Sequence, residues 1–337
     1  MENLITVVLP VYNGEETLPT CIESVQAQTY SGWNLFIVND GSTDGTKKIC
    51  EKYAETDNRI FVFNRENKGV SASRNYAIDR ISTKYFVCVD SDDSVEPFYL
   101  ELLINARTDY PEAGHIWCGF QTVENQSKLN PTPYLASSQK YVSFFDRKDI
   151  MELYSLWLAQ MPWHRLYETD LVKKNNIQMD QALSLGEDLL FNLEYLDNEP
   201  KTKIVVINRP CYNYVRGINE SLDSKYRADL KKIYEKLDQK IRMYLKKWDV
   251  NEENWKIFYN SCFYHYEKIL RNTYHKKSDM SIAEKCKFNN SILQSEEFQE
   301  ILSKRQCYVH PAYLFAYSRK SCLLLWLLDK IAAVKNM

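Results

Sequence analysis

The sequence predicts an α/β protein, with a mostly parallel sheet covered by helices and a helical C-terminal region after it. Short apolar runs alternate with helical segments over the first ninety residues, as in parallel sheets that are covered on both faces. Polar clusters follow the apolar runs. From about residue 223 the pattern is helical, charged and rich in tyrosine.

The elements of the first half can be predicted in order. Four continuous apolar runs predict buried strands, at residues 5–9, 35–38, 60–63 and 85–89. Apolar residues at helical spacing predict three helices between them, at residues 17–28, 47–54 and 71–81. Beyond residue 100 the pattern weakens, with a helix expected near Pro97 and further strands at 116–123 and 203–206.

Length and composition limit the classes of protein. A chain of 337 residues is long enough for about two domains, which we expect at 1–222, in halves 1–110 and 111–222, and at 223–337. A net charge of −2 argues against a nucleic-acid partner. Nine cysteines without a CxxC spacing indicate reduced thiols in the cytoplasm.

The N-terminus enters an apolar strand at once, so no signal peptide is expected. The longest apolar run, 322-CLLLWLL-328, is too short to span a bilayer.

Polar loops follow each predicted strand: 10-PVYN-13, 39-NDGSTD-44, 64-NRENKG-69 and 90-DSDD-93. In open parallel sheets, ligands bind outside the carboxyl ends of the strands. Four loops rich in Asp, Asn and Gly at one edge therefore indicate a binding site.

The loop 90-DSDD-93 crowds three carboxylates into four positions, which is unfavourable unless a positive charge sits beside them. Asp90 and Asp92 suit Mg²⁺ or Mn²⁺, which take one or two carboxylates together with substrate phosphates. Asp93 is expected to cap the following helix instead. Neither GxGxxG nor GxxxxGK[ST] is present, so two common nucleotide-binding motifs are ruled out.

Several motifs together resemble bacterial glycosyltransferases of family 2. They are 7-VVLPVYNGEETLPTCIESVQAQTY-30, 36-FIVNDGSTDGT-46, 64-NRENKGVSASRNYAI-78 and 86-FVCVDSDDSVEP-97, with 163-WHRLYETDLV-172, 186-GEDLLFN-192 and 212-YNYVRGINESL-222 further on. The resemblance implies a GT-A fold, a Rossmann-like nucleotide-sugar domain with a DXD metal motif. Residues 1–110 would bind the nucleotide sugar and 111–222 the acceptor.

The resemblance also implies the residues that bind the donor. They are Pro10, Tyr12, Asp40, Lys68, Gly69, Arg74, Asp90, Ser91 and Arg216. Pro10 and Tyr12 would lie against the base and ribose, and Asp40 would accept the base imide N–H. Arg216 would meet the diphosphate. Asp92, with Asp90, would bind the Mn²⁺ or Mg²⁺ cofactor.

Catalysis and acceptor binding are implied further along the chain. Asp188, with Glu187 beside it, would be the general base. Trp163 would stack on an acceptor sugar, next to His164 and Arg165, which replace the family's usual Asn-Lys and leave the role of position 164 open. One base opposite the leaving group means a single displacement, which inverts the anomeric centre.

The sequence thus predicts an inverting hexosyltransferase that uses a nucleotide-sugar donor, with UDP expected, and a lipid-linked or oligosaccharide acceptor in capsule, exopolysaccharide or O-antigen assembly. A sugar-nucleotide pyrophosphorylase and an inactive nucleotide-sugar-binding module are the rivals. A pyrophosphorylase needs a Gly-rich signature with a basic residue near the first strand, which this sequence lacks. An inactive binding module would lack the catalytic base or a metal ligand.

The C-terminal tail has two interpretations. Its apolar residues fall on one helical face among basic side chains, and they are Leu324, Leu327, Leu328 and Ile331. The helix could contact the inner face of the plasma membrane peripherally, or it could pack on its own domain. Assembly into a homo-oligomer stays open.

Overall fold

The computed structural model of the chain describes residues 4–124, 127–131, 140–216 and 226–335. The described chain forms two compact units, Met1–Ser221 and Leu222–Met337. The expected boundary after residue 222 falls in segment 217–225, outside the described residues, as does the end of the motif 212-YNYVRGINESL-222.

A parallel block begins the first unit. Its strands are β1 (Ile5–Val11), β2 (Trp33–Asp40), β3 (Ile60–Arg65) and β4 (Tyr85–Cys88), paired in the order β3-β2-β1-β4. The helices between them are α1 (Leu18–Gln26), α2 (Thr46–Thr56) and α3 (Val70–Arg80). Each predicted strand and helix of this region is therefore confirmed to within a few residues.

The rest of the sheet is mixed. Its order continues from β4 through β9 (Arg165–Glu168), β6 (His115–Glu124) and β10 (Lys203–Arg216) to β5 (Ser94–Val95). The short strand β9 is antiparallel to both of its neighbours, whereas β10 runs parallel to β6. Two further strands lie off this path, β7 (Ser127–Pro131) on β6 and β8 (Val142–Asp146) on β10. The sequence predicts β6 and the start of β10 but not β9, because four residues carry no readable periodicity.

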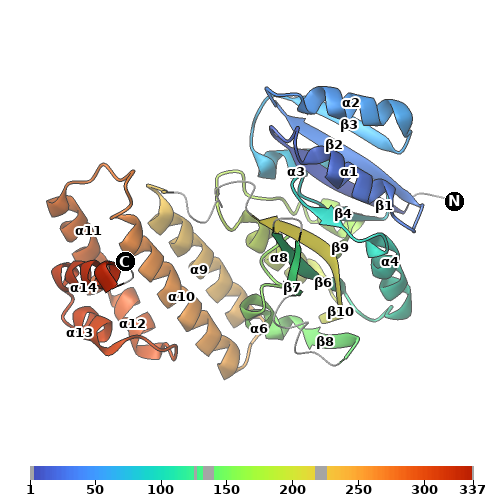
Figure 1. The fold of residues 1–337 in the computed structure, drawn as a ribbon. Helices are drawn as coiled ribbons and strands as arrows, with labels where there is room; N and C mark the ends of the chain where they lie inside the picture. Colours follow the sequence, from blue (N-terminus) through green and yellow to red (C-terminus); the bar gives the residue numbers. More distant parts are fainter. Residues whose placement is uncertain (1–3, 125–126, 132–139, 217–225, 336–337) are drawn as a thin grey trace. The chain divides into compact units, whose positions relative to one another are not determined.

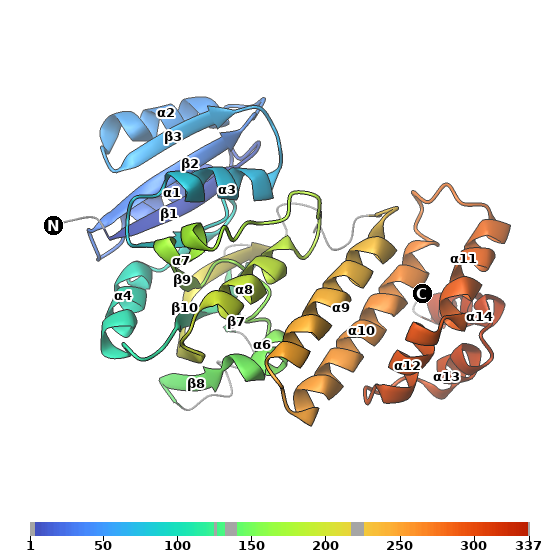
Figure 2. The same ribbon diagram turned by 180° about the vertical axis from the view of Figure 1, so that it is seen from behind.

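Helices cover the sheet. One large core lies where α3, α7 (Thr169–Lys174) and α8 (Glu187–Asn198) pack on the strands, on the face seen in Figure 2. There Phe86 stacks on Tyr167 with ring centroids 4.8 Å apart. The described residues of this unit also form α4 (Tyr99–Asp109), the 3₁₀ helix η1 (Arg147–Asp149) and α6 (Ile150–Ser155). The helix expected near Pro97 begins at Tyr99.

In the second unit every described element is a helix, so this region is mostly helical, as predicted (Figure 1). Its helices are α9 (Leu230–Lys247), α10 (Glu252–Asn272), α11 (Ile282–Gln294), α12 (Glu296–Lys304), α13 (Pro311–Ser318) and α14 (Cys322–Lys335). Apolar side chains from α9, α10 and α12, among them Leu245, Phe258 and Phe298, form its core. No helix in the described part of the chain is both long enough and apolar enough to cross a membrane.

Candidate active site

The site lies at the edge of the sheet where the parallel strands end. Because β1, β2 and β4 are parallel neighbours, the loops that follow them meet at one edge, as predicted. The first two loops are tied together by hydrogen bonds. The backbone N–H groups of Asn13 and Gly14 donate to Ser42 Oγ and Thr46 Oγ1, both at 2.9 Å.

Asp40 ends β2 and is buried. Its carboxylate accepts hydrogen bonds from the backbone N–H groups of Lys68 at 3.1 Å and Gly69 at 2.7 Å. Gly69, the N-cap residue of α3, has φ of +88°, a conformation that residues with a Cβ rarely adopt. A carboxylate has about four acceptor positions, so Asp40 keeps capacity for a further donor such as a base N–H.

Arg74, on α3, is the centre of the site. Its side chain is buried, and its guanidinium bridges two carboxylates from distant parts of the chain. Nη2 lies 2.5 Å from Asp90 Oδ1, and Nη1 lies 2.8 Å from Asp188 Oδ1. Burial acts to lower the pKa of Arg74, but the two carboxylates outweigh it and hold the pKa above its usual value. The arginine therefore stays charged and holds the two acids close together.

The aspartate cluster after β4 is anchored from β10. The buried Tyr212 hydroxyl accepts from the Asp90 backbone N–H at 3.1 Å and donates to Asp93 Oδ2 at 2.6 Å. Asp93 Oδ1 also accepts from the Val215 N–H at 2.8 Å. The prediction that Asp93 caps the next helix is wrong, because its carboxylate ties the loop to β10, and Phe98 occupies the N-cap position of α4.

Asp188 enters the site from the first turn of α8. Gly186, the N-cap residue, has φ of +83°, which a glycine tolerates at no steric cost. Acids in a first helical turn are favoured by the helix dipole. Burial nevertheless raises the pKa of Asp188 to about 7, with Glu187 and Asp90 adding to the shift and Arg74 opposing it. A carboxylate with a pKa near neutrality suits a general base.

Asp92 lies beside Asp90 and is partly buried. Burial, and then the charge of Asp90, raise the pKa of Asp92 to about 6. No group of three His, Cys, Asp or Glu side chains gathers into a metal cage anywhere in the described ranges. Two neighbouring carboxylates fit a Mg²⁺ or Mn²⁺ ion that takes its other ligands from a diphosphate and water.

The other donor-binding residues of the prediction are placed as follows. Pro10 is buried within β1, and Tyr12 just beyond it is 53% exposed, so its ring is available to a ligand. Ser91 is partly buried and Lys68 is exposed. Arg216, the last residue of β10, is exposed, and its guanidinium lies 5.6 Å from the Tyr214 ring centroid.

The acceptor-binding residues of the prediction lie in the core. Trp163 is 2% exposed and stacks on Tyr212 with centroids 4.2 Å apart. His164 is fully buried, with Nε2 3.0 Å from the Leu158 carbonyl, and burial lowers its pKa. Arg165 also donates to that carbonyl and lies 4.0 Å from the Trp117 ring centroid. These positions do not support the prediction of an acceptor surface, because buried side chains offer no face to a sugar.

Sequence reasoning missed Tyr212. The motif 212-YNYVRGINESL-222 drew attention to Arg216, but Tyr212 contacts the aspartate cluster directly. Its alternation with Tyr214 on a strand could have indicated a buried face. Its partner 119 residues earlier in the chain could not be read from that pattern.

The comparisons with known proteins agree with this architecture. Residues 6–172, about half of the chain, match the model of glycosyl transferase family 2, a family of enzymes that act on nucleotide sugars. This part of the chain belongs to that family, in which inversion of the anomeric centre is general.

Two bacterial relatives illustrate the similarity. Glycosyltransferase GlyA of Streptococcus pneumoniae is 33% identical over 223 residues, which are 64% of this chain and 31% of GlyA. The putative glycosyltransferase EpsH of Bacillus subtilis is 27% identical over 95% of this chain and 90% of EpsH. The chain thus spans about a third of the length of GlyA but most of EpsH.

Solved structures share the fold. Residues 1–349 of S. aureus TarS in complex with UDP-GlcNAc superpose with a TM-score of 0.68 at 20% identity, covering 96% of this chain and 89% of that one. The mannosyltransferase PcManGT of Pyrobaculum calidifontis, in complex with GDP-Man and Mn²⁺, gives 0.51 at 13% identity, covering 95% and 87%. The predicted GT-A architecture is thereby confirmed.

Proposed function

We propose that this chain transfers a hexose from a UDP-sugar, with inversion, onto a hydroxyl of a lipid-linked or oligosaccharide acceptor in surface-polysaccharide assembly. The observation that carries the proposal is the Arg74 bridge between Asp90 and Asp188. The bridge brings Asp90, expected to bind the donor, and Asp188, the candidate base, together at the ligand-binding edge of the sheet. UDP-GlcNAc in TarS supports the choice of a UDP donor.

Asp188 is the general base of this proposal. With a pKa of about 7 it is partly ionised at neutral pH, and it can take the proton of an acceptor hydroxyl within hydrogen-bond reach. Glu187 assists through its charge, which raises the Asp188 pKa. Arg74 keeps Asp188 oriented by the 2.8 Å ion pair.

Asp92 and Asp90 would hold a divalent cation, Mn²⁺ or Mg²⁺. When bound, the cation supplies positive charge to the diphosphate leaving group, so that no protein acid is required. PcManGT, a mannosyltransferase of the same fold, was solved with Mn²⁺.

The remaining polar residues of the edge would bind the nucleotide sugar. Tyr12 would lie on the base, Asp40 would accept a base N–H, and Lys68 and Arg216 would approach the negatively charged diphosphate. This assignment follows their positions around the ends of β1, β2, β3 and β10.

The C-terminal helix α14 would bring the enzyme to an anionic membrane surface, where lipid-linked acceptors reside. Four apolar side chains are between 37% and 58% exposed, namely Leu323, Trp326, Leu327 and Ile331. The exposed Arg319, Lys320 and Lys330 lie nearby in sequence. This combination of apolar and basic side chains favours an interfacial location.

The rivals are disfavoured. The family match argues against a pyrophosphorylase. An inactive binding module would lack a base or a metal ligand, whereas Asp188 and Asp92 are both present at the sheet edge.

A panel of nucleotide sugars, incubated with the enzyme in Mn²⁺ or EDTA, tests the proposal. We expect turnover of a UDP-hexose with Mn²⁺, loss of turnover in EDTA, and the same loss in Asp92→Ala. Released nucleoside diphosphate is the readout. Undiminished turnover in EDTA would remove the metal role, and turnover of a GDP-sugar alone would replace the UDP assignment.

A further inference from the structure

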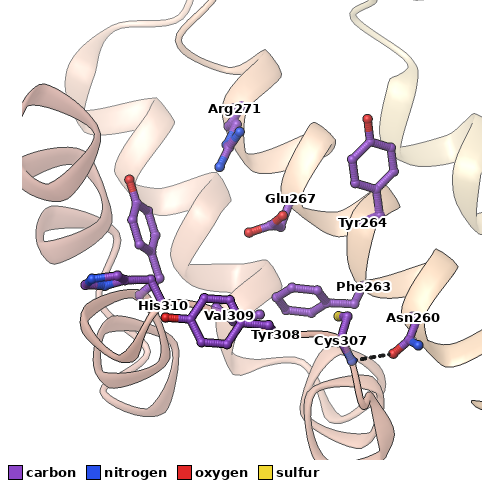
Figure 3. Close-up of a pocket in the computed structure, with 10 residues that line it drawn as sticks. Asn260, Phe263, Tyr264, Glu267, Arg271, Cys307, Tyr308, Val309 and His310 are labelled. Atoms are coloured by element: carbon purple, nitrogen blue, oxygen red, sulfur yellow. Dashed lines mark hydrogen bonds between the residues drawn. The ribbon is translucent and has the colours of Figure 1, made fainter. Parts of the chain in front are cut away.

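A recess lies within the helical C-terminal unit, between α10 and the segment 307–313 (Figure 3). Its volume is about 370 Å³, within the range of sites for small ligands. Every residue that lines it belongs to the unit Leu222–Met337, so the recess shares no residue with the site at the sheet edge.

The walls of the recess are fixed without a ligand. Asn260 Oδ1 on α10 accepts from the backbone N–H groups of Gln306 at 2.7 Å and Cys307 at 2.9 Å. Glu267, also on α10, accepts from the Tyr317 hydroxyl at 2.9 Å. A site held in this way loses little conformational freedom when a ligand binds.

Exposed aromatic rings flank the recess. Tyr308 is 83% exposed and Tyr264 is 55% exposed, although large aromatic side chains are usually well buried. Tyrosine combines a flat apolar face with a polar hydroxyl. Such rings match the apolar C–H faces and polar rim of a pyranose.

The charged side chains of the recess offset each other. Glu267 and Arg271 are four residues apart on α10, hence on the same helical face, and both line the recess (Figure 3). Among the residues that line the recess, one positive and one negative charge balance each other, and the Lys268 ammonium lies 5.0 Å from the Tyr264 ring centroid. A carboxylate and a guanidinium side by side do offer an acceptor and a donor to neighbouring hydroxyls.

We propose that this recess is a saccharide-binding site that takes a neutral oligosaccharide, with its rings against Tyr308 and Tyr264 and its hydroxyls on Glu267 and Arg271. The binding depends only on the recess. The further step, that this saccharide is part of the acceptor of the sugar transfer, rests on the proposed function.

Binding of maltotriose, cellotriose and chitotriose to the full chain, without nucleotide, tests the proposal by calorimetry and saturation-transfer NMR. We expect at least one of them to bind at millimolar concentration, and Tyr308→Ala and Glu267→Gln each to weaken it about tenfold. Tyr308→Phe keeps the ring and should bind as the unmodified protein does. Phe315→Ala alters an aromatic side chain that is 54% exposed outside the recess, and it should also leave binding unchanged.

Two results would overturn the proposal: no binding of any of the three probes, or binding that both Tyr308→Ala and Glu267→Gln leave intact in folded protein. The thermal transition of each variant, followed by circular dichroism, verifies folding. Donor turnover is measured in the same preparations. If the unmodified protein binds a saccharide but turns over no donor, only the proposed function is contradicted. If it turns over a donor but binds no saccharide, only the proposed saccharide site is contradicted.

Discussion

Arg74 connects the two sides of the site through one buried guanidinium. Two carboxylates this close would repel each other and raise each other's pKa without a shared cation. A buried charge is tolerated only when it is paired, and here Asp90 and Asp188 pair it at 2.5 and 2.8 Å. The arginine therefore acts as a positioning residue for both acids.

Asp188→Asn should retain UDP binding and lose transfer by about 10²- to 10⁴-fold, the usual contribution of a general base. The amide oxygen can still accept from Arg74, so the local structure should persist. Transfer kinetics and UDP titration measure the two effects. Asp170→Asn, the same change at an exposed position on α7, is the matched control. Normal transfer by the Asp188 variant would disprove the base assignment.

The pH dependence of transfer should report the ionisation of Asp188. Its pKa is raised from 3.8 to about 7, so the proton stays on the native carboxyl up to that pH and the base is inactive below it. The rate should rise with pH and level off above about 7. For the same reason this group makes the fold less stable as pH rises from about 4 to 7, since the unfolded chain ionises first. A pH–rate profile without a limb near 7 would contradict the assignment.

At the scale of elements, β10 joins the aspartate loop to the core. One end of the strand pairs with β8, and its other end carries Tyr212 and the Val215 N–H to Asp93. Trp163 stacks against the Tyr212 ring and adds packing to this connection. The loop that carries Asp90 and Asp92 is therefore held by packing as well as by hydrogen bonds.

Trp163→Ala should lower the free energy of unfolding by about 3–5 kcal/mol, as expected for a large buried aromatic side chain. Trp163→Phe, which keeps a ring, should cost less. Urea denaturation measures both. If Trp163→Ala were as stable as the unmodified protein while the acceptor KM rose, the predicted sugar-stacking role would be restored.

At the scale of the whole molecule, α14 is buried along one side and exposed along the other. Leu325 is 6% exposed and packs inside the C-terminal unit, while Leu323, Leu327 and Ile331 lie at least 43% exposed. Of the predicted face, Leu327 and Ile331 are exposed, and Leu324 and Leu328 are half-buried. The helix is thus anchored to its unit by one side and exposes the other side to solvent.

Leu327→Glu combined with Ile331→Glu should reduce co-sedimentation with phosphatidylglycerol vesicles at least severalfold, since both apolar contact and attraction to anionic lipid weaken. Both side chains are exposed, so folding should not suffer. Ile282→Glu, at a residue of α11 that is 79% exposed, is the matched control. Equal co-sedimentation of all three proteins would leave α14 a packing helix.

Local pattern was sufficient for much of this protein. Apolar runs and helical spacing predicted β1 to β4 and α1 to α3, and parallel order placed their loops at one edge. Those signals depend on near neighbours in the chain, where the period of a strand or helix is visible. The aspartates of 90-DSDD-93 could therefore be singled out from the amino-acid sequence alone.

Packing between distant segments decided the rest. Asp188 meets Arg74 across 114 residues, and Asp93 meets Tyr212 across 119. Trp163, expected at a surface, is enclosed by rings from β6 and β10. Periodicity shows which face of an element is apolar, but the partner of a buried polar or aromatic group depends on which strands become neighbours, and that is a property of the folded chain alone.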